Sequence, residues 1–310
     1  MKLRRAIEQY TRLKQSLGFR FRTQGYMLRA FSRAMGNVSV GEIKPAAVRV
    51  YLGGHNPPTE TCVQRWHTLR RFFAYAITRG LVRRSPWPLP LQAPKVASTF
   101  TPYIYSQEDL HKLLDAIAPE RTRSLSPQTM RTLLLLLYGA GLRLSEALNL
   151  QDEQVDLKAR ILEVQRSKFF KSRLVPIGPK LTRVLSDYMR ERPPIRGAHR
   201  CFLRTKTGCR LDCSMAGKAF RAVREAAGVK RTDGGRYQPR LHDLRHSRAT
   251  HCLLAWYREG ADIQALLPQL SAYLGHAEIV DTQRYLTITP ELRRRASERF
   301  ARYAWGGDRE

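Results

Sequence analysis

The sequence has few acidic residues and no long hydrophobic segment. It carries 55 lysines and arginines against 26 aspartates and glutamates, so its formal net charge over 310 residues is 55 − 26 = +29. The longest apolar segment, TLLLLLYGAGL at 132–142, is too short to span a bilayer. The opening residues MKLRRAIEQY lack the apolar core of a signal peptide. These absences argue against a membrane partner, and we expect a cytoplasmic protein.

Cysteine is scarce and scattered, with no C-x-x-C pair. An odd, unpaired set of this kind is typical of reduced structural thiols and does not indicate a disulfide framework. Cys209 and Cys213 are close enough in sequence to form half of a zinc site, but nothing else in the sequence supports that interpretation. The five cysteines are Cys62, Cys201, Cys209, Cys213 and Cys252.

The excess of positive charge points to a polyanionic partner. A chain this basic repels itself unless an anion neutralises it, and nucleic acid is the usual anion. Arginine far outnumbers lysine, which favours forked contacts to phosphate oxygens. An anionic membrane surface fits less well, because the basic residues are spread along the whole chain and form no single cluster.

The chain divides into two regions, separated by a proline-rich segment, that differ in predicted secondary structure. Helices are predicted over 3–17, 22–35, 44–54 and 59–80, all four ending at glycines, and we assign 1–83 to an all-helical domain. The segment 84–102 contains Pro86, Pro88, Pro90 and Pro94 and is predicted to be an extended linker.

The second predicted domain, 103–310, combines helices with a small amount of strand. Helices are expected over 105–117, 127–140 and 141–150, and the chain from 214 onward is mostly helical. Two β-rich segments, 160–167 and 171–178, predict a hairpin, and 199–204 is a candidate third strand. The predicted fold class is therefore mainly α with a small antiparallel β-sheet, in two domains.

The segment LHDLRH at 241–246 allows two chemical interpretations. His242 and His246 could bind a metal, because H-x-x-x-H puts two imidazoles one helical turn apart. The zinc-peptidase motif, however, places glutamate directly after the first histidine, where this chain has Asp243. Arg245 would also direct a fixed cation at the metal. We therefore do not expect a metal site.

The second interpretation pairs His242 with Arg245 for binding phosphate. Their i, i+3 spacing puts them on one helix face, just after Pro239, where a helix start offers free N–H groups to an anion. A solvated basic helix is the ordinary alternative.

Four other residues stand in a fixed order around this motif. Arg143 lies in the glycine-flanked GAGLRLSEAL, and Lys168 lies at the hairpin tip. His276 ends YLGH, and Tyr285 follows nine residues later. Each has an ordinary explanation taken alone: an exposed arginine, a solvated lysine, a capping histidine and a packing tyrosine.

In combination these residues resemble one family, the tyrosine recombinases or phage-type integrases, which include the Xer proteins. The resemblance covers essentially the whole chain and rests on GLRLSEAL, LHDLRHSRATH, and LGH with its following tyrosine. It implies a helical domain and a catalytic domain that close as a clamp around double-stranded DNA. It implies neither a metal nor any other cofactor.

The resemblance also implies roles for the motif residues. Arg143 and Arg245 would hold the scissile phosphate, and Tyr285 would attack it to form a 3′-phosphotyrosine ester. His242 and His276 would support them, one in proton transfer and one by hydrogen-bonding the phosphate. Elementary chemistry agrees, because two guanidinium groups can offset the charge that develops on the phosphoryl oxygens and can stabilise a phenolate.

The resemblance leaves the general acid open. Lys168 would protonate the leaving 5′-hydroxyl, but Lys171 competes because Phe169 and Phe170 stand where family members commonly have glycine. The two phenylalanines could stack on a base or pack the hairpin tip. Glu146 matches the family's carboxylate that orients the active-site cations.

The C-terminal segment offers a further choice. Residues 290–304 predict a helix with an apolar stripe at Leu292, Ala296, Phe300 and Tyr303. The stripe could pack on its own domain, or it could dock on a neighbouring subunit, as in family members that assemble as homo-tetramers on two DNA sites. The sequence shows no extra domain before the first helix, so we expect an enzyme that binds simple core sites.

Three functions compete with the leading hypothesis of a site-specific recombinase for integration, excision or transposition of a mobile element. A type IB topoisomerase-like activity would use similar residues to relax supercoiled DNA. A non-catalytic DNA-binding factor would not need the complete set of motif residues. A zinc peptidase would be sensitive to chelators.

Overall fold

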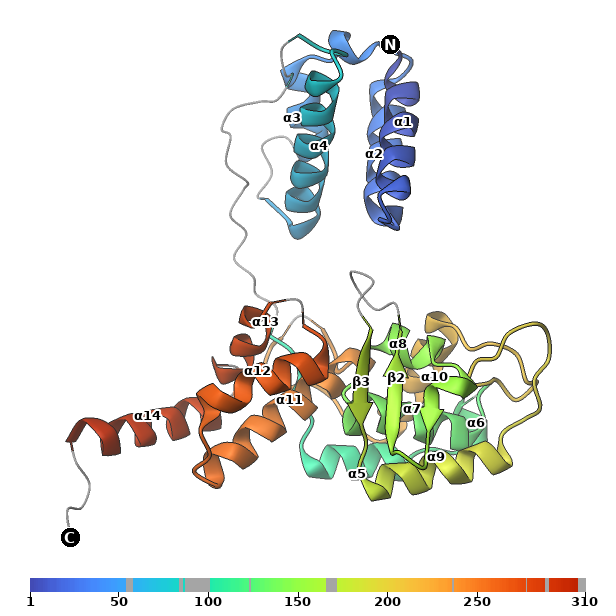
Figure 1. Ribbon diagram of the computed structural model, residues 1–310, viewed down its shortest axis with the longest axis vertical. Helices are drawn as coiled ribbons and strands as arrows, with labels where there is room; N and C mark the ends of the chain where they lie inside the picture. Colours follow the sequence, from blue (N-terminus) through green and yellow to red (C-terminus); the bar gives the residue numbers. More distant parts are fainter. Residues whose placement is uncertain are drawn as a thin grey trace. The chain divides into compact units, whose positions relative to one another are not determined.

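The computed structural model describes residues 1–53, 58–83, 86, 101–122, 124–165, 172–235, 237–276, 278–287 and 290–305. The chain forms two compact units, Met1–Thr99 and Phe100–Glu310 (Figure 1). Most of the predicted linker, 84–102, lies outside the described residues. Within the described part, no helix combines the length and the apolar character needed to cross a bilayer.

The first unit is all helical, as predicted. It consists of α1 (Leu3–Ser16), α2 (Arg22–Met35), a 3-10 turn (Val40–Glu42), α3 (Pro45–Leu52) and α4 (Glu60–Thr78). Its core is aromatic, with Tyr10, Phe31, Phe72 and Phe73 packed among aliphatic side chains. Thr59 caps α4 by accepting a hydrogen bond from the Cys62 amide at 3.2 Å.

The second unit contains ten α-helices in its described residues. They are α5 (Gln107–Asp115), α6 (Pro119–Thr122), α7 (Pro127–Gly139), α8 (Leu144–Asn149), α9 (Pro179–Glu191), α10 (Cys213–Ala226), α11 (Leu241–Arg258), α12 (Ile263–Leu274) and α13 (Val280–Gln283), with α14 (Pro290–Trp305) extending the chain after the 3-10 segment η4 (Arg284–Thr287). Figure 1 shows the strands gathered on one side of this unit, with α11 and α12 beside them.

The sheet has three antiparallel strands in the order β1 (Val155–Asp156), β2 (Ile161–Val164) and β3 (Arg173–Pro176). The predicted hairpin is present, with Val164 paired to Arg173, although its tip, 166–171, lies outside the described residues. The prediction of a third strand at 199–204 was wrong. That segment makes only isolated bridges, and the third strand is β1, which pairs with β2. The fold class is confirmed.

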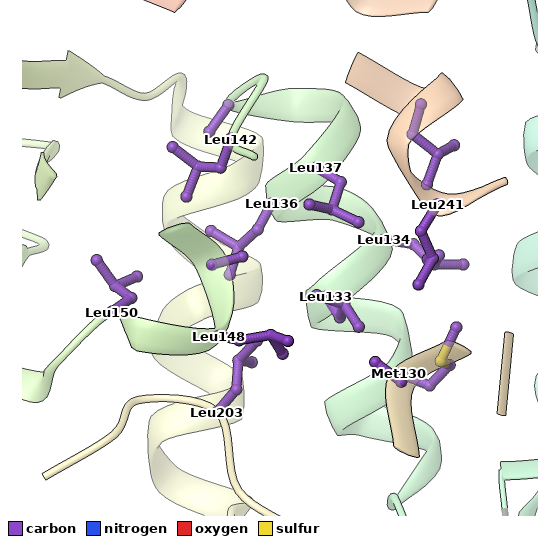
Figure 2. Close-up of a cluster of buried hydrophobic side chains, with 14 of the residues drawn as sticks. Met130, Leu133, Leu134, Leu136, Leu137, Leu142, Leu148, Leu150, Leu203 and Leu241 are labelled. Atoms are coloured by element: carbon purple, nitrogen blue, oxygen red, sulfur yellow. The ribbon is translucent and has the colours of Figure 1, made fainter. Parts of the chain in front are cut away.

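Helix α7 forms the centre of the second unit's core. Leu133, Leu134, Leu136 and Leu137 are all buried, so the helix is covered on several faces rather than on one stripe. Figure 2 shows these leucines meeting side chains from α8, from the start of α11 and from Leu203. Burying α7 in this way fixes α8 and α11 on either side of it, and both helices carry motif residues.

Helix α9 was not predicted, although its sequence carries the signals. Pro179 occupies its first turn, and Leu181, Leu185 and Tyr188 recur at helical spacing. The buried Leu185 and Tyr188 side chains belong to the same core as α7.

The central position of α7 predicts unequal effects of two leucine truncations. Leu133→Ala removes a fully buried side chain and should lower the free energy of unfolding of the second unit by about 2–5 kcal/mol. Leu174→Ala, on a side chain 62% exposed, should change it by less than about 0.5 kcal/mol. Urea titrations of both variants check this, and equal losses would contradict the described core.

Candidate active site

Three arginines converge on the C-terminal end of α12. Consecutive carbonyls accept their hydrogen bonds: the Tyr273 oxygen from Arg173 Nε at 2.9 Å, the Leu274 oxygen from Arg245 Nη2, and the Gly275 oxygen from Arg143 Nη2 at 2.6 Å. The last carbonyls of a helix lack partners within the helix, and the helix dipole makes that end negative. The end of α12 therefore binds and orients cations.

The carboxylate of Glu146 lies among the same three arginines. It accepts hydrogen bonds from Arg143 Nη1 at 2.7 Å and from Arg173 Nη1 and Nη2 at 3.0 and 2.8 Å, and Arg245 Nη1 lies 4.0 Å away. Glu146 also accepts from the backbone amide of Arg143 at 2.9 Å, which places it in the first turn of α8. One carboxylate thus ties together α8, β3 and α11.

Glu146 is held in its charged form. Burial alone would raise its pKa, but the hydrogen bonds and charge of Arg173, followed by those of Arg143, lower the pKa to about 2. Three guanidinium groups against one carboxylate leave a surplus of 3 − 1 = +2 charges at this point. Such a surplus can attract an anion.

Gly275 is needed at the end of α12 for two reasons. Its φ of +69° is in the left-handed region that favours glycine. A Cβ at this position would also lie 2.6 Å from Arg173 Nη1. The glycine of the LGH motif therefore lets the chain turn toward His276 while the guanidinium packs against its backbone.

The start of α11 shows what the residues of HDLRH do. The Asp243 carboxylate accepts from the Arg240 backbone amide at 2.9 Å and from the Arg240 guanidinium at 2.9 Å, so it caps its own helix. Arg245 is only 2% exposed and also donates to the Gly141 carbonyl. Burial, with the charge of Arg143 adding to it, lowers the Arg245 pKa to about 10, which leaves the group charged at neutral pH.

The metal interpretation gains no support from this geometry. The described residues hold no cluster of three or more histidines, cysteines, aspartates and glutamates suited to a metal ion. Asp243 is engaged by Arg240, and His246 Nδ1 lies 2.9 Å from the Tyr285 Oη. Cys209 and Cys213 are free, exposed thiols.

Tyr285 lies in η4 and is only 3% exposed. The His276 ring stacks beside its ring at a centroid distance of 6.0 Å, while His276 Nδ1 is hydrogen-bonded to Thr282 Oγ1 at 2.6 Å. The positive charge of Arg245 also acts on the phenol. The structure therefore brings Tyr285, His276, Arg245 and Arg143 into one site with Glu146.

The protonation tendencies in the site follow from burial and positive charge. Burial raises the pKa of Tyr285, while the charges of Arg245 and Arg143 oppose that rise. Burial and the neighbouring Arg245 lower the pKa of His276 to about 4. His242 is an exposed residue, yet partial burial and then the charge of Arg245 lower its pKa as well. The histidines are therefore neutral at neutral pH.

Two residues of the site were missed by the sequence analysis. Arg173 lies two residues before the buried Val175 on β3 and so shares its inward face, and a charged side chain on that face could have indicated a buried acidic partner. His246 was considered only as half of a metal pair. Lys168, Lys171, Phe169 and Phe170 lie outside the described residues, so the general acid stays a prediction.

The family is decided by comparison of the chain with known proteins. Residues 104–291 match the model of the phage integrase family. The chain belongs to that family, the tyrosine recombinases. The resemblance predicted from Arg143, HDLRH and LGH is thus confirmed.

Similar proteins match from two thirds of the chain to nearly its full length. One, named "Putative integrase/recombinase y4rB" from Sinorhizobium fredii, is 34% identical and aligns with 96% of this chain and 97% of its own. A tyrosine recombinase XerA from Thermococcus kodakarensis is 34% identical over 67% of this chain and 66% of its own. Among solved structures, a lambda integrase dimer bound to a COC′ core site has a TM-score of 0.69 at 16% identity, covering 94% of this chain and 97% of that chain, which shows a shared fold.

The buried carboxylate predicts a stability difference that depends on pH. Because the folded-state pKa of Glu146 is about 2 against an ordinary value of 4.5, its charge stabilises the fold by about 3 kcal/mol above pH 4.5. That contribution is lost as the pH falls from 4.5 toward 2. Glu146→Gln should therefore be less stable than the unaltered chain at pH 7, and the two should converge near pH 2.

Denaturant titrations from pH 7 to pH 2 measure this difference. Glu153→Gln, on an exposed residue two positions before β1, is the matched control and should follow the unaltered chain throughout. A constant difference for Glu146→Gln at all pH values would contradict the assigned role of the carboxylate.

Proposed function

We propose that this tyrosine recombinase cuts and rejoins DNA at specific sites through a covalent 3′-phosphotyrosine intermediate formed by Tyr285. The observation that supports this most directly is that Tyr285 lies close enough to feel the charges of Arg245 and Arg143, the two arginines that share the Glu146 carboxylate. Family membership supports the activity, and the geometry supports the assignment of residues.

Arg143 and Arg245 bind the scissile phosphate in this proposal. Each guanidinium has five N–H donors, and the bonds to Glu146, Gly141 and the α12 carbonyls occupy only some of them. The remaining donors can hold the two non-bridging oxygens as charge develops in the transition state. Because these bonds already hold both guanidinium groups in place, the groups need little reorganisation when DNA binds.

Tyr285 attacks the phosphorus while the 5′-oxygen leaves. The positive charges of Arg245 and Arg143 favour the phenolate, and a phenol needs this help because its ordinary pKa is about 10. Lys168, or Lys171 in its place, would give a proton to the leaving oxygen. The phosphotyrosine ester keeps the energy of the broken bond, so a DNA hydroxyl can reseal the strand without ATP.

The first unit supplies further contacts to the DNA backbone in this proposal. On α1, a shallow hollow is lined by Lys2, Arg4, Arg5 and Arg12 together with Glu8, Gln9 and Asn37. On α4, Arg70, Arg71 and Arg79 are exposed. Phosphate oxygens accept from such side chains regardless of sequence, which would position the duplex.

A nicked suicide substrate that carries the native site tests the proposed function. The unaltered chain should form a covalent protein–DNA adduct in the presence of EDTA, and Tyr285→Phe should form none, because only the phenol oxygen can make the ester. Denaturing gel electrophoresis measures the adduct. Adduct formation by Tyr285→Phe, or its loss on chelation, would contradict the proposal. Relaxation of any supercoiled plasmid without a site would favour a topoisomerase-like activity.

We also propose assembly on two DNA sites through the C-terminal helix. The predicted apolar stripe divides between two environments. Leu292 is fully buried beside Leu253, Leu254 and Tyr285 of its own unit, whereas Phe300, two turns later, is 64% exposed. In Figure 1, α14 extends away from the rest of the second unit. The part of α14 around Phe300 is therefore suited to contact another subunit. We expect the protein to act in the cytoplasm.

Because Leu292 is buried and Phe300 is exposed, substitutions at these two positions of α14 should have different effects. Phe300→Ser should leave single-site cleavage and thermal stability unchanged while slowing strand exchange between two sites about tenfold or more, since a buried aromatic anchor commonly contributes 2 kcal/mol to an interface. Leu292→Ala should instead lower the melting temperature. Strand exchange assays with both variants measure this, and normal exchange by Phe300→Ser would refute docking through Phe300.

A further inference from the structure

The phenol of Tyr285 has a specific partner that the assignments above do not use. His246 Nδ1 lies 2.9 Å from the Tyr285 Oη, and the two ring centroids are 5.5 Å apart. His246 follows Arg245 directly on α11, one helical turn after His242. The contact joins α11 to η4 across 39 positions of sequence.

The neighbours of the phenol leave His246 as the side chain placed to accept its proton. The guanidinium groups of Arg245 and Arg143 can only donate, so neither can accept the phenolic hydrogen. His276 Nδ1 is already engaged with Thr282 Oγ1 at 2.6 Å. In the neutral tautomer that carries its proton on Nε2, His246 Nδ1 accepts the phenolic hydrogen.

The surroundings keep His246 able to accept. Burial, and after it the charges of the nearby His242, Arg245, Arg240 and His276, together lower its pKa to about 3. The ring is therefore neutral before DNA binds. A phosphate held by Arg143 and Arg245 would bring negative charge close to the ring and raise its affinity for a proton.

We propose that His246 is the general base that takes the proton of Tyr285 during strand cleavage. This inference rests on the proposed function. The Tyr285 Oη–H bond breaks and its proton moves to His246 Nδ1, the Oη–P bond forms, and the P–O5′ bond breaks, with the 5′-oxygen taking a proton from the separate general acid. In resealing, the imidazolium returns the same proton to the departing Tyr285 oxygen.

Single-turnover cleavage of the suicide substrate by His246→Ala and His246→Asn tests the base. His246→Ala should slow cleavage by about 100-fold or more, in the range typical of general base catalysis. His246→Asn keeps an acceptor oxygen near the position of Nδ1 but cannot take a proton, so it should remain nearly as slow. DNA binding, measured by gel shift, should be unchanged in both.

A substrate with sulfur in place of the bridging 5′-oxygen separates base from acid. A 5′-thiolate leaves without protonation, so this substrate should restore cleavage to variants of the general acid and should not restore it to His246→Ala. Recovery of His246→Ala on this substrate would overturn the proposal, as would full activity of His246→Asn, which would indicate positioning alone. Wild-type cleavage rates in His246→Ala would overturn it as well.

These outcomes stay distinct from failure of the proposed function. If the unaltered chain forms no adduct through Tyr285, the proposed function itself fails. If it forms the adduct, and His246→Ala forms it as fast with an unchanged melting temperature, only the assignment of His246 fails.

Discussion

The site depends on one constraint: three guanidinium groups must lie close together although their positive charges repel one another. Glu146 and three successive carbonyls at the end of α12 meet this constraint together. The carboxylate offsets one charge, and the helix end offsets a further part through its dipole. What is left is a rigid positive surplus, which is the property that phosphoryl transfer requires.

The charged groups of the site are held rigidly because each is attached to a packed element of the fold. Helix α7, buried on several faces, fixes α8 and α11, and therefore fixes Glu146 and Arg245. The hairpin brings Arg173 from a distant part of the chain to the same carboxylate. Removing any one of these supports would leave a buried charge without its partner, which is far more costly than losing an exposed ion pair.

Most of the fold class and most of the site could be predicted from the sequence. Helices end at glycines and begin at caps such as Thr59 and Ser106, and these signals are local. The third strand could not be placed, because a two-residue strand such as β1 is selected by pairing with β2 and has no pattern of its own. Arg143, Arg245, His276 and Tyr285 were found by their motifs. Arg173 and His246 were missed, because their roles arise from contacts between segments far apart in sequence.

The central claim is that Tyr285, surrounded by fixed cations, forms the covalent bond to DNA. The most direct measurement is mass spectrometry of the protein–DNA adduct, digested after reaction of the unaltered chain with the native site in EDTA. The account predicts a 3′-linked nucleotide on the peptide that contains Tyr285. A nucleotide on any other residue, or no adduct without divalent cations, would contradict it.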